Sequence, residues 1–182
     1  MRTLSILCLA VASAAVLNST VATSPSEARR AFARGANGTA GAWATQGQYG
    51  SRYGARVLTP TAGAGFSNNN VAGPNGGTFQ NQGKFGYKQG VGAFRKNNWS
   101  GTTPAGGSAN GYVNSKYNAQ TGQGTRQSGA EYTNPQGQSY GYDGNTSYTK
   151  GQGGTTSVDT MNNGTYNVDW QKGQKPVVTT TP

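Results

Sequence analysis

After residue 28 the chain contains no isoleucine, and Leu58 and Met161 are its only leucine and methionine. Helical bundles and doubly wound α/β domains need stripes of Leu, Ile and Val, so this chain cannot build either architecture. The apolar side chains that remain are mainly Tyr, Phe, Trp and Val. We therefore expect an all-β fold whose core is made of these four residue types.

The first 28 residues are typical of a secretory signal peptide. Met1-Arg2 is followed by an apolar run rich in Leu, Ala and Val (3–17) and then by small residues. The run is shorter than the ~20 residues that span a bilayer, but it suits the apolar region of a leader. We expect cleavage after Ala28, with Ala22 and then Ala14 as the alternatives. The protein is then secreted, extracellular or periplasmic, with no stable membrane insertion after signal removal.

Once the leader is removed, the chain has neither cysteine nor histidine. Disulfides, ordinary zinc sites, haem pockets and Cys–His or Ser–His pairs are therefore excluded. Asp143 and Asp159 have the residue type of a glycosidase pair, but we expect both to be solvated acids on a sheet. We expect no enzymatic activity, no cofactor and no metal.

A spacing recurs three times in the middle of the chain. Pro74, Pro104 and Pro135 each open a Pro-x-Gly sequence, and they lie 30 and 31 residues apart. A tyrosine stands 13 residues after each of them: Tyr87, Tyr117 and Tyr148. Pro followed by Gly suits a tight turn between two strands, and a fixed period indicates a structural repeat. The sequence predicts an antiparallel β-meander of hairpin repeats with a ~30-residue period over residues 66–175.

The turns also predict how the strands pair. A three-residue Pro-x-Gly loop places Tyr132 opposite Tyr140, and the same rule places Val71 opposite Phe79.

The last hairpin is predicted from alternation. Polar and apolar residues alternate over 165–171, the period of a half-buried strand. A turn at 162–164 closed by a left-handed Gly164 sets Val158 opposite Val168 and places Trp170 on the buried face. A two-residue loop would pair Asp159 with Val168 instead, which burial of the apolar face disfavours.

The two ends of the mature chain show no sustained period. Residues 29–65 are rich in Gly, Ala, Arg and Tyr, a composition that cannot offset its own backbone entropy. We expect a flexible basic arm there, with one or two strands around Ala42–Tyr53. The tail, 176–182, is expected to be disordered.

Charge is divided along the chain. From Arg29 to Arg126 there are 11 basic residues and no acid, whereas four acids and three lysines follow from Glu131 onward. This asymmetry favours a polyanion partner, either nucleic acid or acidic polysaccharide, although spaced like charges also keep a chain soluble. The candidate contacts are Arg29, Arg30, Arg34, Arg52, Arg56, Lys84, Lys88, Arg95 and Lys96.

Two functions remain open at this stage. The first is a secreted, non-enzymatic structural or adhesive protein of the cell surface or extracellular matrix, able to self-associate through its sheet edges. The alternative is a module that binds a polyanion, namely extracellular nucleic acid or acidic glycan.

Overall fold

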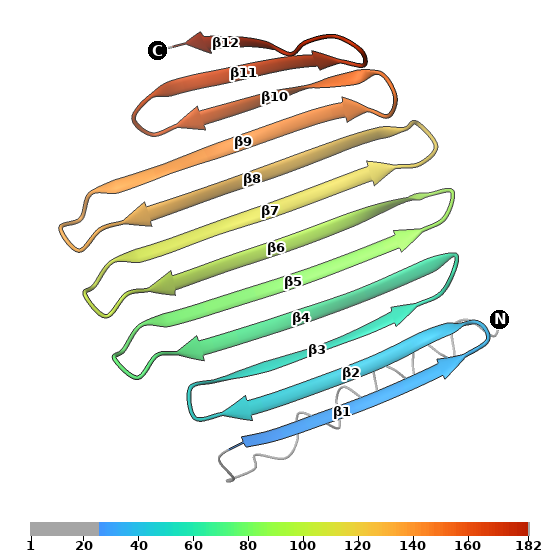
Figure 1. Ribbon diagram of the computed structural model, residues 1–182, viewed down its shortest axis with the longest axis vertical. Coiled ribbons are helices and arrows are strands. Elements are labelled where there is room, and N and C mark those ends of the chain that lie inside the picture. Colours follow the sequence, from blue (N-terminus) through green and yellow to red (C-terminus); the bar gives the residue numbers. More distant parts are fainter. Residues whose placement is uncertain (1–25, 182) are drawn as a thin grey trace.

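A computed structural model describes residues 26–181, which form one twelve-stranded antiparallel β-sheet (Figure 1). The expected all-β meander is confirmed, and no helix occurs between residues 26 and 181. The strands are β1 (Ser26–Gly35), β2 (Gly38–Gly47), β3 (Gly50–Leu58), β4 (Ala62–Ala72), β5 (Thr78–Lys88), β6 (Gly92–Thr102), β7 (Ser108–Asn118), β8 (Gln123–Thr133), β9 (Ser139–Thr149), β10 (Gly153–Thr160), β11 (Gly164–Gln171) and β12 (Val177–Thr181). Their order in space is their order in sequence.

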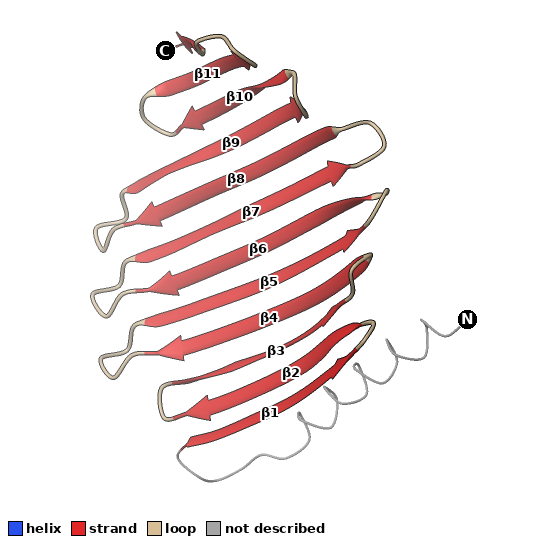
Figure 2. Ribbon diagram, turned by 45° about the vertical axis from the view of Figure 1, so that its right-hand side comes forward, coloured by secondary structure: helices blue, strands red, loops and turns tan. Residues whose placement is uncertain are grey.

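The sheet is a single layer, as the turned view shows (Figure 2). Ala42, at 7% exposure, is the only buried hydrophobic residue in the described part of the chain. The expected core of Tyr, Phe, Trp and Val is therefore wrong as an enclosed core, because every described aromatic ring is half-buried or exposed.

Aromatic rings bury apolar surface within the layer itself, because each ring lies over a glycine of the neighbouring strand. A Cβ atom added to Gly111 would lie 2.6 Å from two ring atoms of its cross-strand partner Trp99. A Cβ on Gly86 would likewise lie 2.6 Å from the ring of its partner Phe94. Only glycine leaves room for such rings, which cover the backbone and compensate for the missing side chain. This explains why a chain rich in Gly and aromatic residues forms a sheet without a second layer.

The proline turns have the predicted geometry. Tyr132 lies opposite Tyr140 and Val71 opposite Phe79, so both predicted pairings are confirmed. The backbone N–H of Asn134 donates to the carbonyl of Gln138 at 2.9 Å, which closes the loop. The third loop residue is in the left-handed region in each turn: Gly76 (φ 90°), Gly106 (φ 90°) and Gly137 (φ 83°).

The ~30-residue repeat corresponds to a pair of 11-residue strands with its turns. Consecutive proline turns precede β5, β7 and β9, and all three lie on the same side of the sheet, at the left-hand ends of the strands in Figure 1. The tyrosines 13 residues after the prolines come near the ends of these strands. Tyr117 and Tyr148 stack there with ring centroids 6.5 Å apart, and Gly124 of β8 lies between them in the register.

The C-terminal hairpin has the predicted face but not the predicted register. Val168 lies opposite Thr156, and Val158 lies opposite Tyr166, a shift of two residues from the expected pairing. The reason is the turn: it starts at Met161, and Gly164 (φ 75°) is already the first residue of β11. Because the shift is even, Val158, Val168 and Trp170 still share one side of the sheet.

The structure differs from the expected arm and tail. Residues 29–65 lie in β1, β2, β3 and the start of β4, and residues 177–181 form β12. The strands expected around Ala42–Tyr53 are confirmed as β2 and β3, but the rest of the arm is strand as well. A periodic apolar face is the signal that predicts a strand packed on a core, but in a single layer a strand needs only a neighbour with which to pair. The unpaired edges of the described sheet are thus β1 and β12, because every strand from β2 to β11 has a partner on both sides.

Residues 1–25, which hold most of the expected signal peptide, lie outside the described residues. Strand β1 begins at Ser26, so cleavage after Ala28 would shorten it by three residues, whereas cleavage after Ala22 would leave it whole. No helix in the described part of the chain is long and apolar enough to cross a membrane.

Candidate functional site

Six of the seven arginines in the described part of the chain lie on one side of the sheet. Antiparallel partners project from the same side, and successive residues of a strand alternate, so the register assigns each residue to a face. Six exposed arginines share one face: Arg30 and Arg34 of β1, Arg52 and Arg56 of β3, Arg95 of β6 and Arg126 of β8. We call this side the arginine face and the other side the lysine face.

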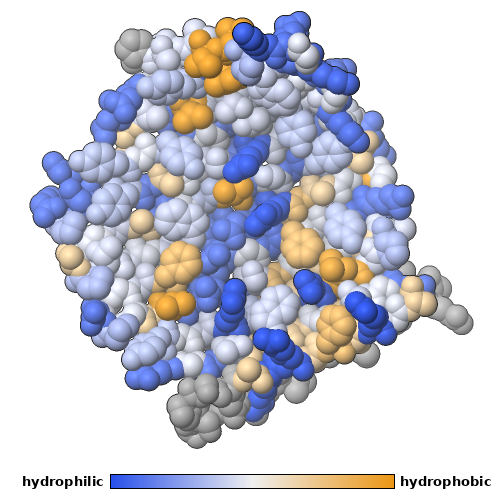
Figure 3. Space-filling model, in the orientation of Figure 1, coloured by the Kyte–Doolittle hydropathy of each residue, from blue (hydrophilic) through white to orange (hydrophobic). Residues whose placement is uncertain are grey.

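Most aromatic side chains lie on the arginine face as well. All three tryptophans, Trp43, Trp99 and Trp170, project from it. Figure 3 shows this face: strongly hydrophilic side chains alternate with hydrophobic ones over the first strands, and hydrophobic side chains gather again at the C-terminal end. Cations and rings are therefore interleaved on one exposed surface.

Acidic side chains are confined to the opposite side. The four acids after residue 130, Glu131, Asp143, Asp159 and Asp169, all lie on the lysine face. The strand lysines, Lys84, Lys88, Lys96 and Lys116, lie there too. No acidic side chain that the structure describes lies on the arginine face to neutralise its cations.

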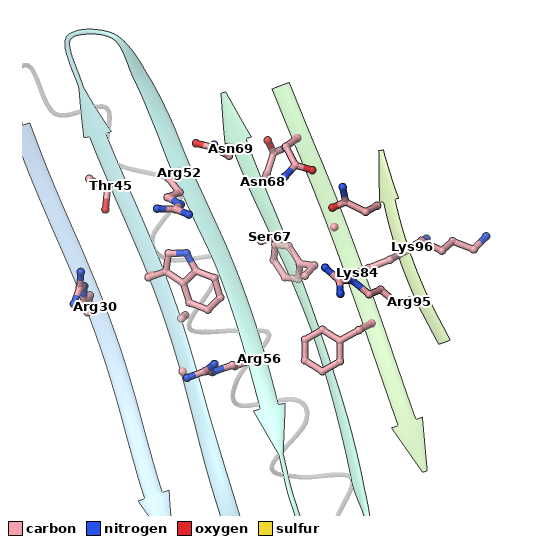
Figure 4. A pocket seen from close by; sticks show the side chains of 18 of the residues that line it. Arg30, Thr45, Arg52, Arg56, Ser67, Asn68, Asn69, Lys84, Arg95 and Lys96 are labelled. Atoms are coloured by element: carbon pink, nitrogen blue, oxygen red, sulfur yellow. The ribbon is translucent and has the colours of Figure 1, made fainter. Parts of the chain in front are cut away.

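A hollow of about 1040 Å³ opens on the arginine face over β1 to β6 (Figure 4). Arg30, Arg52, Arg56 and Arg95 are among the side chains that line it. Aromatic and amide side chains complete the wall, from Phe32, Trp43, Phe85, Asn69, Asn81 and Asn97. Its described lining contains no carboxylate, so the hollow offers cations, flat rings and amide groups to a ligand.

Two amide oxygens among the residues that line this hollow lack a partner. The side-chain oxygens of Asn68 and Asn81 are buried and accept no hydrogen bond from the described residues, although the Asn68 amide donates to the Tyr53 hydroxyl at 2.9 Å. Buried amide oxygens normally have a partner, so these two atoms are exceptions in the described part of the chain.

The structure divides the predicted contacts into two groups. Arg30, Arg34, Arg52, Arg56 and Arg95 lie together on the arginine face, as the register shows. The other four, Arg29, Lys84, Lys88 and Lys96, have register positions on the lysine face.

Two of these four still border the hollow. Lys84 and Lys96 belong to its lining, but they are register partners of each other on the lysine face, so they do not share the surface of the arginines. Sequence reasoning omitted Arg126 and Trp43, whose positions become apparent only when the register assigns each residue to a face.

Like charges oppose each other on the lysine face. Lys84 pairs in register with Lys96, and Asp143 with Asp159. The Tyr112 hydroxyl donates a hydrogen bond to Asp143 Oδ1 at 2.8 Å, which raises the pKa of Tyr112 because the phenol proton is held by the carboxylate. Both aspartates are exposed, in keeping with the expected solvated acids. No group of three or more acidic, His or Cys side chains that could hold a metal occurs in the described part of the chain.

The comparisons with known proteins add no assignment. No family model, curated protein or solved structure matches this chain. The class that the fold defines is a single-layer antiparallel β-sheet with one cationic, aromatic face.

Proposed function

We propose that the protein is a secreted, non-enzymatic adhesive protein that binds an acidic polymer through its arginine face. The observation that carries the proposal is the segregation of charge: six arginines share a face on which no described acid lies. Random placement on alternating strands would mix the two signs on both surfaces.

Chemistry supports an acidic polymer as the ligand. The arginine guanidinium forms bidentate hydrogen bonds with phosphate and carboxylate groups, and it is less strongly hydrated than the lysine ammonium. The exposed ring of Phe32 and the half-buried rings of Trp43 and Phe85 offer flat surfaces on which bases or sugars can stack. A broad sheet surface suits a polymer because many weak interactions can act together.

Salt dependence tests the proposal. Binding to oligothymidylate, used as a probe polyanion, should weaken steeply with salt because counterions are released on binding. Replacing Arg52 and Arg56 together with glutamine should weaken binding and reduce the salt slope by about 1.4, since each phosphate that is no longer neutralised lowers the slope by about 0.7. Both arginines are exposed, so the change leaves the sheet folded.

A matched double variant separates the effect of the arginine face from the effect of net charge. Replacing Lys88 and Lys116 with glutamine removes the same number of charges from the lysine face, at exposed positions that do not line the hollow. Affinity close to that of the unchanged protein is expected for this control. Equal losses in the two double variants would show that total charge alone attracts the polymer, and the proposed face would be wrong.

A further inference from the structure

One line of register partners on the arginine face crosses eight strands. It starts on β1, passes through the hollow and continues beyond it to β8. Its members are Phe32, Gly41, Arg56, Gly65, Phe85, Arg95, Ser115 and Arg126. We call this line the cross-strand row. Its first six members line the hollow or lie between residues that do, whereas Ser115 and Arg126 lie outside it.

The row is long and evenly stepped. Neighbouring strands lie ~4.8 Å apart, so the seven steps from Phe32 to Arg126 span about 34 Å. Arg56 and Arg95 are three steps apart, about 14 Å, and Arg95 and Arg126 are two steps apart, about 10 Å. The cations are therefore separated by intervals much longer than a single strand spacing.

Rings and glycines form the surface around the cations. A Cβ on Gly65 would lie 2.7 Å from the ring of Phe85 and 2.9 Å from Arg56 Cβ, so the ring and the arginine stem lie over the glycine. A Cβ on Gly41 would lie 3.2 Å from the ring of Phe32, which is 62% exposed. Glycines thus keep the floor of the row low and leave ring surface open above it.

From this geometry we infer that the ligand is a linear acidic polysaccharide that lies across the strands, along the cross-strand row from β1 to β8. Arg56, Arg95 and Arg126 pair with its acid groups, and Phe32 and Phe85 stack on its sugar rings. This inference rests on the proposed function and gives it a ligand class, an orientation and one further binding residue, Arg126.

The spacing of the cations favours a polysaccharide over a nucleic acid. A stacked nucleic-acid strand carries one phosphate every 3.4 Å, so most phosphates along the row would meet no arginine. A polysaccharide with one acid group in each disaccharide has a neutral sugar between its charges. At about one sugar per strand spacing, this pattern matches the two-step interval between Arg95 and Arg126, where Ser115 lies between the cations. The three-step interval between Arg56 and Arg95, which holds Gly65 and Phe85, is one sugar longer, about 5 Å, and the long, flexible arginine side chains can span that difference.

Arg126 is the residue that decides the orientation. It lies five strands from Arg56 and outside the hollow, so only a ligand that runs across the strands can contact both. The experiment measures binding of hyaluronan oligosaccharides of increasing length to the purified protein, with tryptophan fluorescence as the signal. Affinity is expected to rise with length and level off near eight sugars, at about one strand spacing per sugar.

Substitution of Arg126 then has a length-dependent effect. Arg126→Gln should weaken binding of a long oligosaccharide roughly fivefold, the effect of losing one exposed ion pair, and leave a short one of about four sugars unchanged. Lys116→Gln is the matched control, because Lys116 lies on neighbouring β7 but on the lysine face. It should leave both affinities unchanged.

The outcomes separate the inference from the function on which it rests. Failure of hyaluronan, heparin and oligothymidylate all to bind would overturn the proposed function and the row together. Binding that depends on Arg52 and Arg56 but neither on ligand length nor on Arg126 would overturn the row alone. Tighter binding of oligothymidylate than of a hyaluronan of equal length would overturn the choice of a polysaccharide.

Discussion

Gly111→Ala should destabilise the sheet because the new methyl group would collide with a tryptophan ring. The added Cβ would lie 2.6 Å from Cε2 and Cζ2 of Trp99, whereas carbon atoms at ordinary separation are ~3.5–4.0 Å apart. Trp99 must therefore move by about 1 Å or more, and the apolar cover over β7 is lost. Overpacking of this kind costs ~1–3 kcal/mol, and we expect about 2 kcal/mol. At this chain length that lowers Tm by about 4–8 °C.

Gly144→Ala is the matched control on the same face of the sheet. Its Cβ would lie 3.5 Å from the backbone and side-chain oxygens of Ser128, which is an ordinary van der Waals distance. Neither this glycine nor Gly111 has a positive φ, so alanine fits the backbone at both positions. The control should be neutral, or stabilising by ~0.4–1 kcal/mol through the unfolded chain.

Circular dichroism during heating measures the Tm of both variants. Trp99→Val, alone and combined with Gly111→Ala, completes a double-mutant cycle. Without the indole ring, Gly111→Ala should lose most of its cost, because nothing remains for the methyl group to displace. Equal changes in Tm for Gly111→Ala and Gly144→Ala would refute the role assigned to rings over glycines. An undiminished cost in the Trp99→Val background would refute it as well.

Three further outcomes are expected. Trp170→Ala should lower the free energy of unfolding by about 2 kcal/mol, roughly half the value for a fully buried ring, because Trp170 is half-buried. Asp169→Asn changes an exposed position, so its effect in the same denaturation assay should stay within about 0.5 kcal/mol. Asp143→Asn should lower the pKa of Tyr112 back toward its ordinary value of 10.0, and ultraviolet titration of the tyrosines, compared between the variant and the unchanged protein, would detect this fall. Secreted protein should begin at or near Arg29, and intact-mass measurement of exported protein would contradict this if the leader were retained.

The proline turns were predictable because their causes are local. Pro135 fixes φ at the start of the loop and Gly137 takes the left-handed position at its end, so counting outward gives the pairing of Tyr132 with Tyr140. The C-terminal turn has no proline, and its Asn162-Asn163-Gly164 sequence does not fix where the loop begins. That is why the face of Trp170 was predicted but its partner was not.

The division into two faces could not be predicted, because it depends on the length of every connection. Arg95 and Arg126 share a face although one position is odd and the other even. The four-residue connection between Asn118 and Gln123 causes this, since the connections before β6 and β10 have three residues. One added residue exchanges the two sides for all strands that follow. The sequence therefore predicted cationic residues but not which of them meet at a single site.

A single-layer sheet without an enclosed core can gain or lose strands while the remaining strands keep their sequences and partners. Substantial contacts between the described strands join sequence neighbours only, from β1 and β2 through to β11 and β12. Duplicating one hairpin of about 30 residues would therefore insert two strands and leave every other pairing as it was. It would also add two strands to the arginine face, so that duplication of the gene segment could lengthen this surface while each unit keeps its own stability.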